Sequence, residues 1–323
     1  MNPTNQKLKV SAAVRELLCC PACHSRLIRE ATHLSCGSRS CGADYPIVDG
    51  IPVLIDDGAG VFLKNDFLAG EATTLALPKK SLSQTIKRVL PRLGRNLATA
   101  RNYENLREML VNNKQPRVLV IGGSIAGDGM AVLLKEEGIE FVETDVSFGP
   151  RTQIICDGHS LPFVDGSFDA VIIQAVIHCL IDPTRVVREI RRVLKPDGLV
   201  YAEAPFLQQV INSPYDFQRF TKIGLRKLFR EFAEVESGIV SGPGTALAWS
   251  IQFFFLTFFT ARAPRGIVRV LCSLTLFWLK YLDPYLVKNR RAADAASGFF
   301  FMGRKSLGPA CTDRMLVRTY EVA

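Results

Sequence analysis

Short apolar runs alternate with amphipathic segments through the middle of this 323-residue chain, and no other feature constrains its fold as strongly. Four runs have the composition of buried strands: RVLVI at 117–121, IEFVETDVS at 139–147, FDAVIIQAV at 168–176 and LVYAEA at 199–204. Strands that alternate with helices form a parallel sheet with helices on both faces. The sequence therefore predicts an α/β fold built on a doubly wound, Rossmann-like sheet.

The segment DPTRVVREIRRVLKPDG, residues 182–198, predicts a well-delimited helix. Asp182 can cap its first turn, and Pro183 occupies the first helical position. One apolar stripe follows at helical spacing, formed by Val186, Val187, Ile190, Val193 and Leu194. The Pro-Asp-Gly sequence at the end of the segment then terminates the helix.

The first strand leads into a glycine-rich turn, IGGSIAGDG, and then into apolar residues at helical spacing. Glycines let the backbone approach a nucleotide closely. Asp145 ends the second strand roughly 20 residues beyond the glycines, where an acidic residue binds a ribose diol. These two features also fit a dinucleotide-binding dehydrogenase, so they do not by themselves identify the class of enzyme.

Residues 157–206 read DGHSLPFVDGSFDAVIIQAVIHCLIDPTRVVREIRRVLKPDGLVYAEAPF. This segment resembles the class I S-adenosylmethionine-dependent methyltransferases, in the branch that includes the quinone-biosynthesis C-methyltransferases. That branch carries D-x-x-x-L-P-F-x-D-x-S-F-D, then a strand, a D-P helix and R-V-L-K-P-G-G. Together with the first two strands, the resemblance covers residues 116–240.

The resemblance implies a site for S-adenosylmethionine. The residues that would hold it are Gly122, Gly123 and Ser124 at the methionine part, Asp145 at the ribose hydroxyls, Asp157, Gly158 and His159 on the adenine side, and Gln174 near the sulfonium. The chain departs from the family in its glycine spacing and in lacking the acidic residue that ends the first strand. A degenerate member of the fold, acting as a binding or scaffold protein, is therefore an alternative.

The segment PFLQQVINSPYDFQRFTKIGLRKLF, residues 205–229, resembles the loop that covers the substrate in relatives. This resemblance implies Tyr215, Asp216 and Arg219 as candidate catalytic residues. A structural ion pair between Arg219 and Asp216 is the alternative.

Five of the nine cysteines fall between residues 19 and 41. Cys20 and Cys23 form a C-x-x-C pair, and Cys36 and Cys41 form a second, wider pair. Two such pairs can surround one tetrahedral zinc, and a closed four-thiolate site is structural rather than catalytic. Cys19 is left over and could substitute for Cys20.

The sequence DYPIVDGIPVLI follows the last of these cysteines within a few residues. Asp49-Gly50 is a turn signal, so Tyr45–Val48 and Ile51–Ile55 predict a hairpin. With the cysteine pairs, this segment resembles the zinc-ribbon family typified by the small partner subunit of tRNA and protein methyltransferases. The resemblance covers about residues 15–58.

These segments divide the chain into a zinc-ribbon domain (1–59), a basic linker with short helices (60–115), a methyltransferase domain (116–307) and a C-terminal tail (308–323). The linker contains a run of basic residues: Lys79, Lys80, Lys87, Arg88, Arg92 and Arg95. Such runs are usually solvated. The alternative is an RNA or protein methyltransferase that binds its substrate through the ribbon and this linker.

An apolar insert, residues 245–290, separates the two strands expected to close the sheet, FAEVESGIV and SGFFFMGRK. It contains the uncharged stretch Thr245–Ala261 and the apolar stretch Gly266–Leu282. Because both ends return to one domain, the insert predicts a helical hairpin that lies in a membrane surface. Its basic residues would contact lipid headgroups: Arg262, Arg265, Arg269, Lys280 and Lys288. A two-pass hairpin, packing on the core and packing on a second subunit in a homodimer remain open.

The formal net charge of +9 permits a polyanionic partner or an anionic membrane surface. The N-terminus lacks the apolar core of a signal peptide. We therefore expect a cytoplasmic protein, peripheral on the cytoplasmic membrane, that methylates a small, hydrophobic or lipid-linked acceptor. Nucleic acid is the alternative partner.

Overall fold

The computed structural model describes residues 7–58, 60–68, 90–306, 308 and 311–322. Much of the predicted linker, with Lys79, Lys80, Lys87 and Arg88, lies outside these residues.

The N-terminal ribbon, residues 7–58, is built from short antiparallel strands. Its elements are α1 (Ala12–Arg15), β1 (Leu27–Arg29), β2 (His33–Cys36), β3 (Asp44–Val48) and β4 (Ile51–Leu54). β3 and β4 form the predicted hairpin, with Val48 paired to Ile51. The turn places Asp49 and Gly50 at φ angles of 50° and 77°, the left-handed conformation that a tight hairpin of this type requires.

The middle of the chain forms the predicted doubly wound α/β sheet. Its strands are β5 (Arg117–Ile121), β6 (Glu140–Asp145), β7 (Ile154–Cys156), β8 (Phe168–Gln174) and β9 (Leu194–Pro205), closed by β10 (Phe232–Ser241) and β11 (Gly298–Lys305). Pairing is parallel from β7 through β6, β5 and β8 to β9, whereas β11 and β10 add antiparallel. The fold class and the closing strand pair are therefore confirmed.

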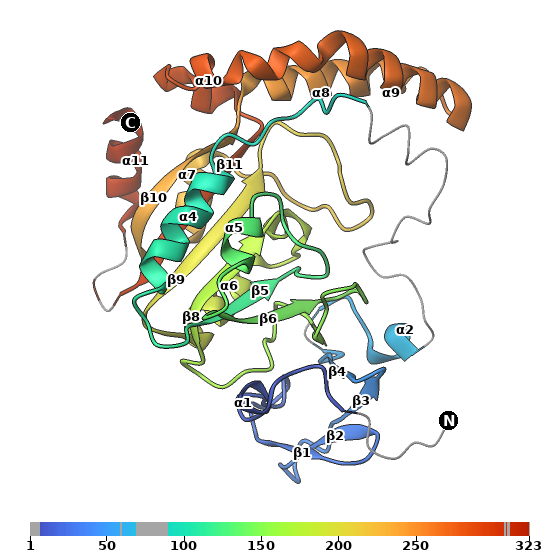
Figure 1. The fold of residues 1–323 in the computed structure, drawn as a ribbon, viewed down its shortest axis with the longest axis vertical. Coiled ribbons are helices and arrows are strands. Elements are labelled where there is room, and N and C mark those ends of the chain that lie inside the picture. Colours follow the sequence, from blue (N-terminus) through green and yellow to red (C-terminus); the bar gives the residue numbers. More distant parts are fainter. Residues whose placement is uncertain (1–6, 59, 69–89, 307, 309–310, 323) are drawn as a thin grey trace.

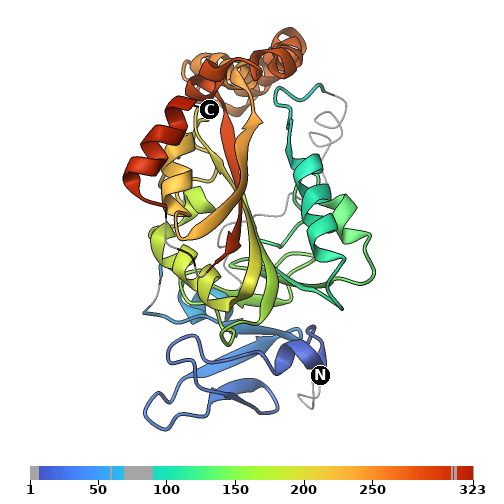
Figure 2. The same cartoon turned by 90° about the vertical axis from the view of Figure 1, so that its left-hand side faces the viewer.

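Helices cover both faces of this sheet (Figure 2). They are α4 (Thr99–Leu110) and α5 (Ala131–Leu134) on one face, and α6 (Pro183–Val193) and α7 (Lys222–Leu228) on the other. Successive residues of a strand contribute to the hydrophobic clusters on opposite faces of the sheet, because their side chains point alternately to the two faces. Leu119 and Val171 are buried with α6 and α7, whereas Val118 and Ala170 are buried with α4 and α5.

Helix α6 begins where the sequence predicts but ends earlier, at Val193. Leu194 and the Pro-Asp-Gly sequence belong to β9 instead, because Leu194 has an extended backbone conformation and pairs with Phe168 of β8. Asp182 caps α6, since its Oδ1 accepts the backbone N–H of Arg185 at 3.0 Å. α4 lies within the predicted linker, yet its Tyr103 and Leu106 are fully buried against the sheet. This helix therefore belongs to the core. The predicted C-terminal tail contains α11 (Asp313–Val322), which lies beside α7.

The ribbon and the central sheet are continuous. β4 pairs in parallel with β7, with Val53 opposite Ile155 and Leu54 opposite Cys156. The described strands consequently form one sheet in the order β1-β2-β3-β4-β7-β6-β5-β8-β9-β11-β10. The sequence predicted two separate units here and gave no signal for this pairing.

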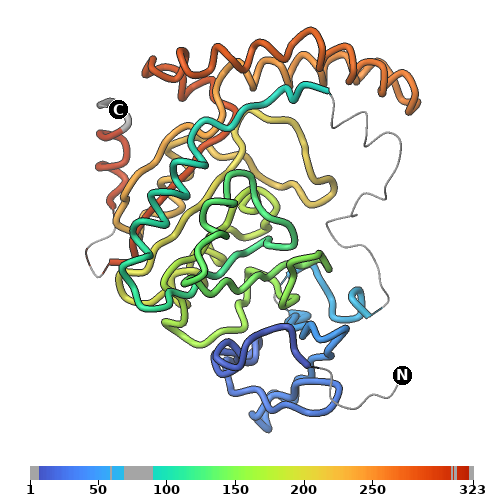
Figure 3. The backbone as a smooth tube through the Cα atoms, viewed as in Figure 1, coloured from blue at the N-terminus to red at the C-terminus, as the bar shows by residue number. Residues whose placement is uncertain are grey.

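The insert between β10 and β11 is a helical hairpin at the end of the molecule opposite the ribbon (Figures 1 and 3). It comprises α8 (Pro243–Leu256), α9 (Arg262–Leu276) and, after a short 3-10 turn, α10 (Asp283–Leu286). The buried Asp283 carboxylate fixes its base by accepting the backbone N–H groups of Gly244 at 2.6 Å and Thr245 at 3.2 Å. A carboxylate at a helix N-terminus satisfies donors that the helix leaves free.

The hairpin presents an apolar face to solvent. Its exposed large side chains include Leu247, Phe254, Phe255, Phe258, Phe259, Ile267, Leu271, Leu274 and Trp278. Two of the basic residues expected at lipid headgroups instead bond to backbone carbonyls: Arg265 to that of Leu256 and Lys280 to that of Arg92. Among the described residues, no helix combines the length and the hydropathy needed to cross a bilayer.

Candidate functional site

A cavity of about 430 Å³ opens at the carboxyl ends of the parallel strands. This edge is where open α/β sheets bind ligands. Seven of the predicted site residues line it: Gly122, Asp145, Asp157, Gly158, His159, Gln174 and Tyr215. The fold thus collects side chains from turns that are far apart in the sequence.

The turn after β5 shapes one wall of the cavity. Gly122 has a φ of 77°, and a Cβ there would lie 2.3 Å from Cγ2 of Val176, so a side chain does not fit. Gly123 and Ser124 do not line the cavity but lie behind the wall. The Ser124 N–H donates to Asp145 Oδ2 at 3.0 Å, and burial raises the pKa of this carboxyl. Gly123 and Ser124 therefore position the loop and Asp145.

Asp157 and His159 form a fixed pair in another wall. His159 Nδ1 donates to Asp157 Oδ1, and His159 Nε2 accepts the backbone N–H of Asp182 at 3.2 Å. These partners select the neutral imidazole with its proton on Nδ1. Gly60 packs so closely that a Cβ there would lie 2.0 Å from Asp157 Oδ2. The segment after the ribbon therefore covers this side of the cavity.

A buried carboxylate, Glu203 at the end of β9, also lines the cavity and was not predicted. Its Oε1 accepts hydrogen bonds from the hydroxyls of Thr99 and Tyr201, and its Oε2 accepts from Gln174 Nε2 at 3.0 Å. Tyr103 OH donates to Gln174 Oε1 at 2.9 Å. Burial raises the pKa of Glu203, and its hydrogen-bond donors oppose that rise.

Glu203, Tyr103 and Phe62 line the cavity but were not among the predicted site residues. Glu203 is an ionisable residue inside an apolar strand, and such a residue is costly to bury unless it has a task or partners. Tyr103 lies in the segment predicted to be a linker, where no sequence pattern marks it as part of a site. Phe62 also enters the wall, and its ring centroid lies 5.4 Å from that of Tyr215.

Asp216 and Arg219 hold the loop together and do not line this cavity. Arg219 pairs with Asp216 and donates to the carbonyls of Gln208 and Gln209 at 2.9 Å each. Asp216 also accepts the N–H of Ile211 at 2.7 Å, and its hydrogen bonds with Arg219 lower its pKa to about 2. These bonds favour the structural alternative for this pair, because its polar groups are already engaged, and the catalytic roles stay a prediction.

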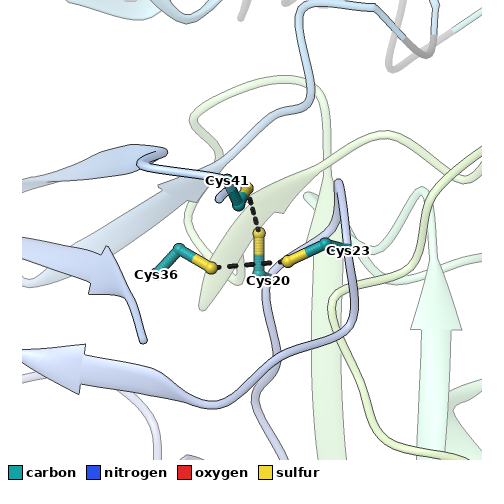
Figure 4. Close-up of side chains that lie close together, drawn as sticks. All are labelled: Cys20, Cys23, Cys36 and Cys41. Carbon is teal, nitrogen blue, oxygen red and sulfur yellow. Dashed lines mark hydrogen bonds between the residues drawn. The ribbon is translucent and has the colours of Figure 1, made fainter. Parts of the chain in front are cut away.

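The four predicted metal ligands converge in the ribbon (Figure 4). The Sγ atoms of Cys20, Cys23, Cys36 and Cys41 all lie within 4.8 Å of one another. The Cys20–Cys41 distance is 3.8 Å and the Cys23–Cys36 distance is 3.4 Å. Tetrahedral Zn–S bonds of about 2.3 Å would separate the sulfurs by about 3.8 Å. The four side chains therefore fit a single tetrahedral ion.

Cys19 stands apart from this cluster. Its sulfur lies 3.7 Å from His24 Nδ1, and burial raises the pKa of the thiol to about 12. Its backbone N–H donates to the carbonyl of Pro162 at 2.9 Å, beside the cavity loop. On the same loop Ser160 Oγ donates to the carbonyl of Pro21, which lies within the first cysteine pair. The cysteine cluster is thus joined directly to the wall that carries His159.

Known proteins match the part of the chain that builds this cavity. Residues 126–202 match a family described as "Methyltransferase domain". An uncharacterized chloroplastic methyltransferase of Arabidopsis thaliana is 37% identical over 84 residues, which are 25% of this chain and 24% of the relative. The ubiquinone/menaquinone biosynthesis C-methyltransferase of Desulfotalea psychrophila is 30% identical over 89 residues, 28% of this chain and 32% of the relative.

Among solved structures, the [4+2]-cyclase SpnF is similar, with 18% identity and a TM-score of 0.40, over 76% of this chain and 92% of that one. The chain spans about a quarter to a third of the length of the curated relatives it matches.

The buried Glu203 predicts a pH effect on stability. Because its pKa is raised above the ordinary 4.5, the folded protein keeps this proton where the unfolded chain has lost it. The contribution of Glu203 to the free energy of unfolding should therefore fall as pH rises through the raised pKa. We expect parent stability, relative to Glu203→Gln, to decrease from pH 5 to pH 8 in urea titrations. The exposed Glu108→Gln substitution on α4 is the matched control and should show no trend; a constant difference for Glu203→Gln would contradict the prediction.

Proposed function

We propose that this protein is an S-adenosylmethionine-dependent methyltransferase. The observation that carries the proposal is the placement of Asp145 and Asp157 in one cavity beside the Gly122 turn. The match of residues 126–202 to a methyltransferase domain supports it. When bound, S-adenosylmethionine supplies a methyl group on an activated sulfonium.

The cavity residues suit the parts of this cofactor. Asp145 would accept the ribose hydroxyls in charge-assisted hydrogen bonds. Asp157 and its partner His159 would line the adenine side, with the apolar side chains of Val61 and Phe62 also in the wall. Gln174 is fixed by Tyr103 and Glu203 near the place expected for the sulfonium. The resemblance to the branch that includes the quinone-biosynthesis C-methyltransferases stays a prediction and does not specify the methylated atom.

Cofactor binding is tested by calorimetry with S-adenosylhomocysteine. Asp145→Asn should weaken binding about ten-fold or more, because a charge-assisted hydrogen bond contributes about 1.5–3 kcal/mol. Asp157→Asn should have a similar effect, and Glu108→Gln should bind like the parent. A parent protein that binds neither S-adenosylhomocysteine nor S-adenosylmethionine would favour a degenerate scaffold.

The cysteine cluster is proposed to hold one structural zinc ion. All four sulfurs are committed to the cluster, which leaves no open coordination position for chemistry. The ion would replace part of the hydrophobic core that a ribbon of this size lacks.

Elemental analysis should find one zinc per chain in the parent protein. Cys36→Ser should lose the metal and lower the thermal unfolding temperature, because the ribbon shares a sheet with the rest of the molecule. Cys19→Ser is the matched control and should retain the metal, since the Cys19 sulfur contacts His24 and is not part of the four-sulfur cluster. Full zinc content in Cys36→Ser would refute the four-cysteine assignment.

The acceptor is proposed to be hydrophobic or lipid-linked, and the α8–α9 hairpin is proposed to lie on an anionic, cytoplasmic membrane surface. Its solvent-facing aromatic side chains form a patch of the kind that soluble monomers rarely expose. Arg262, Arg269 and Lys288 of the insert are also exposed, and each near-surface basic residue adds about 1 kcal/mol on anionic lipid. The apolar face and these basic residues together favour lipid over a second subunit.

Liposome flotation tests this placement with a substitution that spares the fold. Phe254→Ser combined with Phe258→Ser removes two of the most exposed rings and should reduce the bound fraction at least ten-fold. Met315→Ser combined with Val317→Ser on α11 is the control with equally exposed side chains elsewhere. Binding should rise with anionic lipid and fall with salt. A dimeric protein that ignores liposomes and becomes monomeric in the double variant would assign the face to a second subunit.

A further inference from the structure

A second cavity of about 270 Å³ adjoins the first on the side of the hairpin. The two cavities share four wall residues: Asn96, Asp128, Ala175 and Glu203. The second cavity continues past His178 and Gln208 to Ser241 and to Trp249 of α8. It therefore connects the proposed cofactor site with the base of the apolar hairpin.

Glu203 has one hydrogen-bonding position left to offer. A carboxylate oxygen accepts about two hydrogen bonds. Oε1 already accepts two, from Thr99 and Tyr201, whereas Oε2 accepts one, from Gln174. Because Glu203 lines both cavities, a group at their junction can take the remaining position on Oε2.

The second cavity has another polar group without a partner. His178 is buried in its wall, and within the described residues its Nδ1 has no hydrogen-bond partner. Burial lowers the pKa of His178, which favours the neutral ring. Since this Nδ1 is itself covered by neighbouring atoms, Glu203 Oε2 is the acceptor on these walls that a ligand hydroxyl would meet.

The second cavity adjoins a surface groove that has both polar and apolar walls. The ring of Trp249 lies 6.0 Å from that of Phe253 in α8. An open groove beside α8 contains Phe253 and Phe254 and meets the second cavity at Gln208. A molecule with a polar head and an apolar tail can therefore place its head at Glu203 and its tail along the hairpin.

We propose that the second cavity binds the hydroxyl-bearing headgroup of an amphiphilic acceptor and that Glu203 accepts the hydroxyl proton. The inference rests on the proposed methyltransferase function and specifies its acceptor. Methylation of the hydroxyl oxygen forms an O–CH₃ bond and breaks the S–CH₃ bond of the methyl donor, whose sulfur keeps the electron pair. The released proton passes to Glu203 Oε2. Burial makes this carboxylate a stronger base than one in water, because it raises the pKa.

The acceptor class is tested by direct binding. The probe is octyl β-glucoside below its micellar concentration, titrated calorimetrically into the full-length protein saturated with S-adenosylhomocysteine. Glu203→Gln should bind this probe about ten-fold or more weakly. Ser241→Leu places a larger side chain in the part of the second cavity that is not shared with the first, and it should weaken binding of the probe in the same way. Cofactor affinity is compared in Ser241→Leu, whose site lies outside the first cavity, and this variant should keep its affinity for S-adenosylhomocysteine within about three-fold. Glu108→Gln is the charge-removal control.

A second readout follows transfer of a labelled methyl group to octyl β-glucoside. The parent rate should rise with pH to a plateau, and Glu203→Gln should be slower by about 100-fold without that rise. Glu203→Asp should retain part of the rate and the pH dependence. These outcomes would support Glu203 as the proton acceptor rather than as a structural residue.

The experiments distinguish a failure of the proposed function from a failure of the proposed acceptor site. A parent that does not bind S-adenosylhomocysteine overturns the proposed function itself. A parent that binds it, but binds octyl β-glucoside no better than Glu203→Gln and Ser241→Leu do, overturns only the acceptor site. Preferential binding or methylation of octylamine overturns the hydroxyl class. If Glu203→Gln does not fold, as judged by circular dichroism, Ser241→Leu decides.

Discussion

The pairing of β4 with β7 is the interaction on which the rest of this structure depends. This pairing joins a cysteine-rich ribbon and an α/β sheet into one continuous sheet through two residue pairs, Val53 with Ile155 and Leu54 with Cys156. An unpaired edge strand leaves backbone donors and acceptors exposed, so the ribbon also protects the edge at β7. The hydrophobic core also extends across this junction, since Leu34 and Tyr45 of the ribbon belong to the same buried cluster as the residues under α6 and α7.

This connection places the cysteine cluster close to the cavity. The loop after β7 carries Asp157 and His159, and its next residue, Ser160, donates to the carbonyl of Pro21, which lies between Cys20 and Cys23. The chain that leaves the ribbon then passes over the same loop, with Gly60 against Asp157 and Phe62 in the wall. The ribbon therefore contributes to one side of the cavity, and the proposed metal would act on ligand binding through these contacts.

The cavity concentrates buried carboxylates, and each is stabilised differently. Asp145 is held by a backbone N–H, Asp157 by a neutral imidazole, and Glu203 by hydroxyl and amide groups. Burying such groups is costly unless donors satisfy them. For Glu203, Oε2 accepts one hydrogen bond, which leaves an acceptor position that a ligand hydroxyl or amino group would use. The position of the hairpin at the far end of the second cavity adds an apolar surface next to these polar groups.

The sequence by itself determined the features that depend on neighbouring residues. The alternation of apolar strands with amphipathic helices predicted the parallel sheet. The Asp-Pro sequence predicted the start of α6, and the Asp49-Gly50 turn predicted the hairpin beside the cysteine pairs. Local chemistry also pointed to Asp145, because a carboxylate at the end of a strand lies at the ligand-binding edge of the sheet. Only the tertiary structure decided which long-range partners meet. It paired β4 with β7, brought Tyr103 and Glu203 to Gln174, and committed Arg219 to backbone carbonyls rather than to the cavity. These outcomes depend on register, burial and the competition for hydrogen-bond partners among segments distant in the chain, and a linear pattern carries no information about that competition.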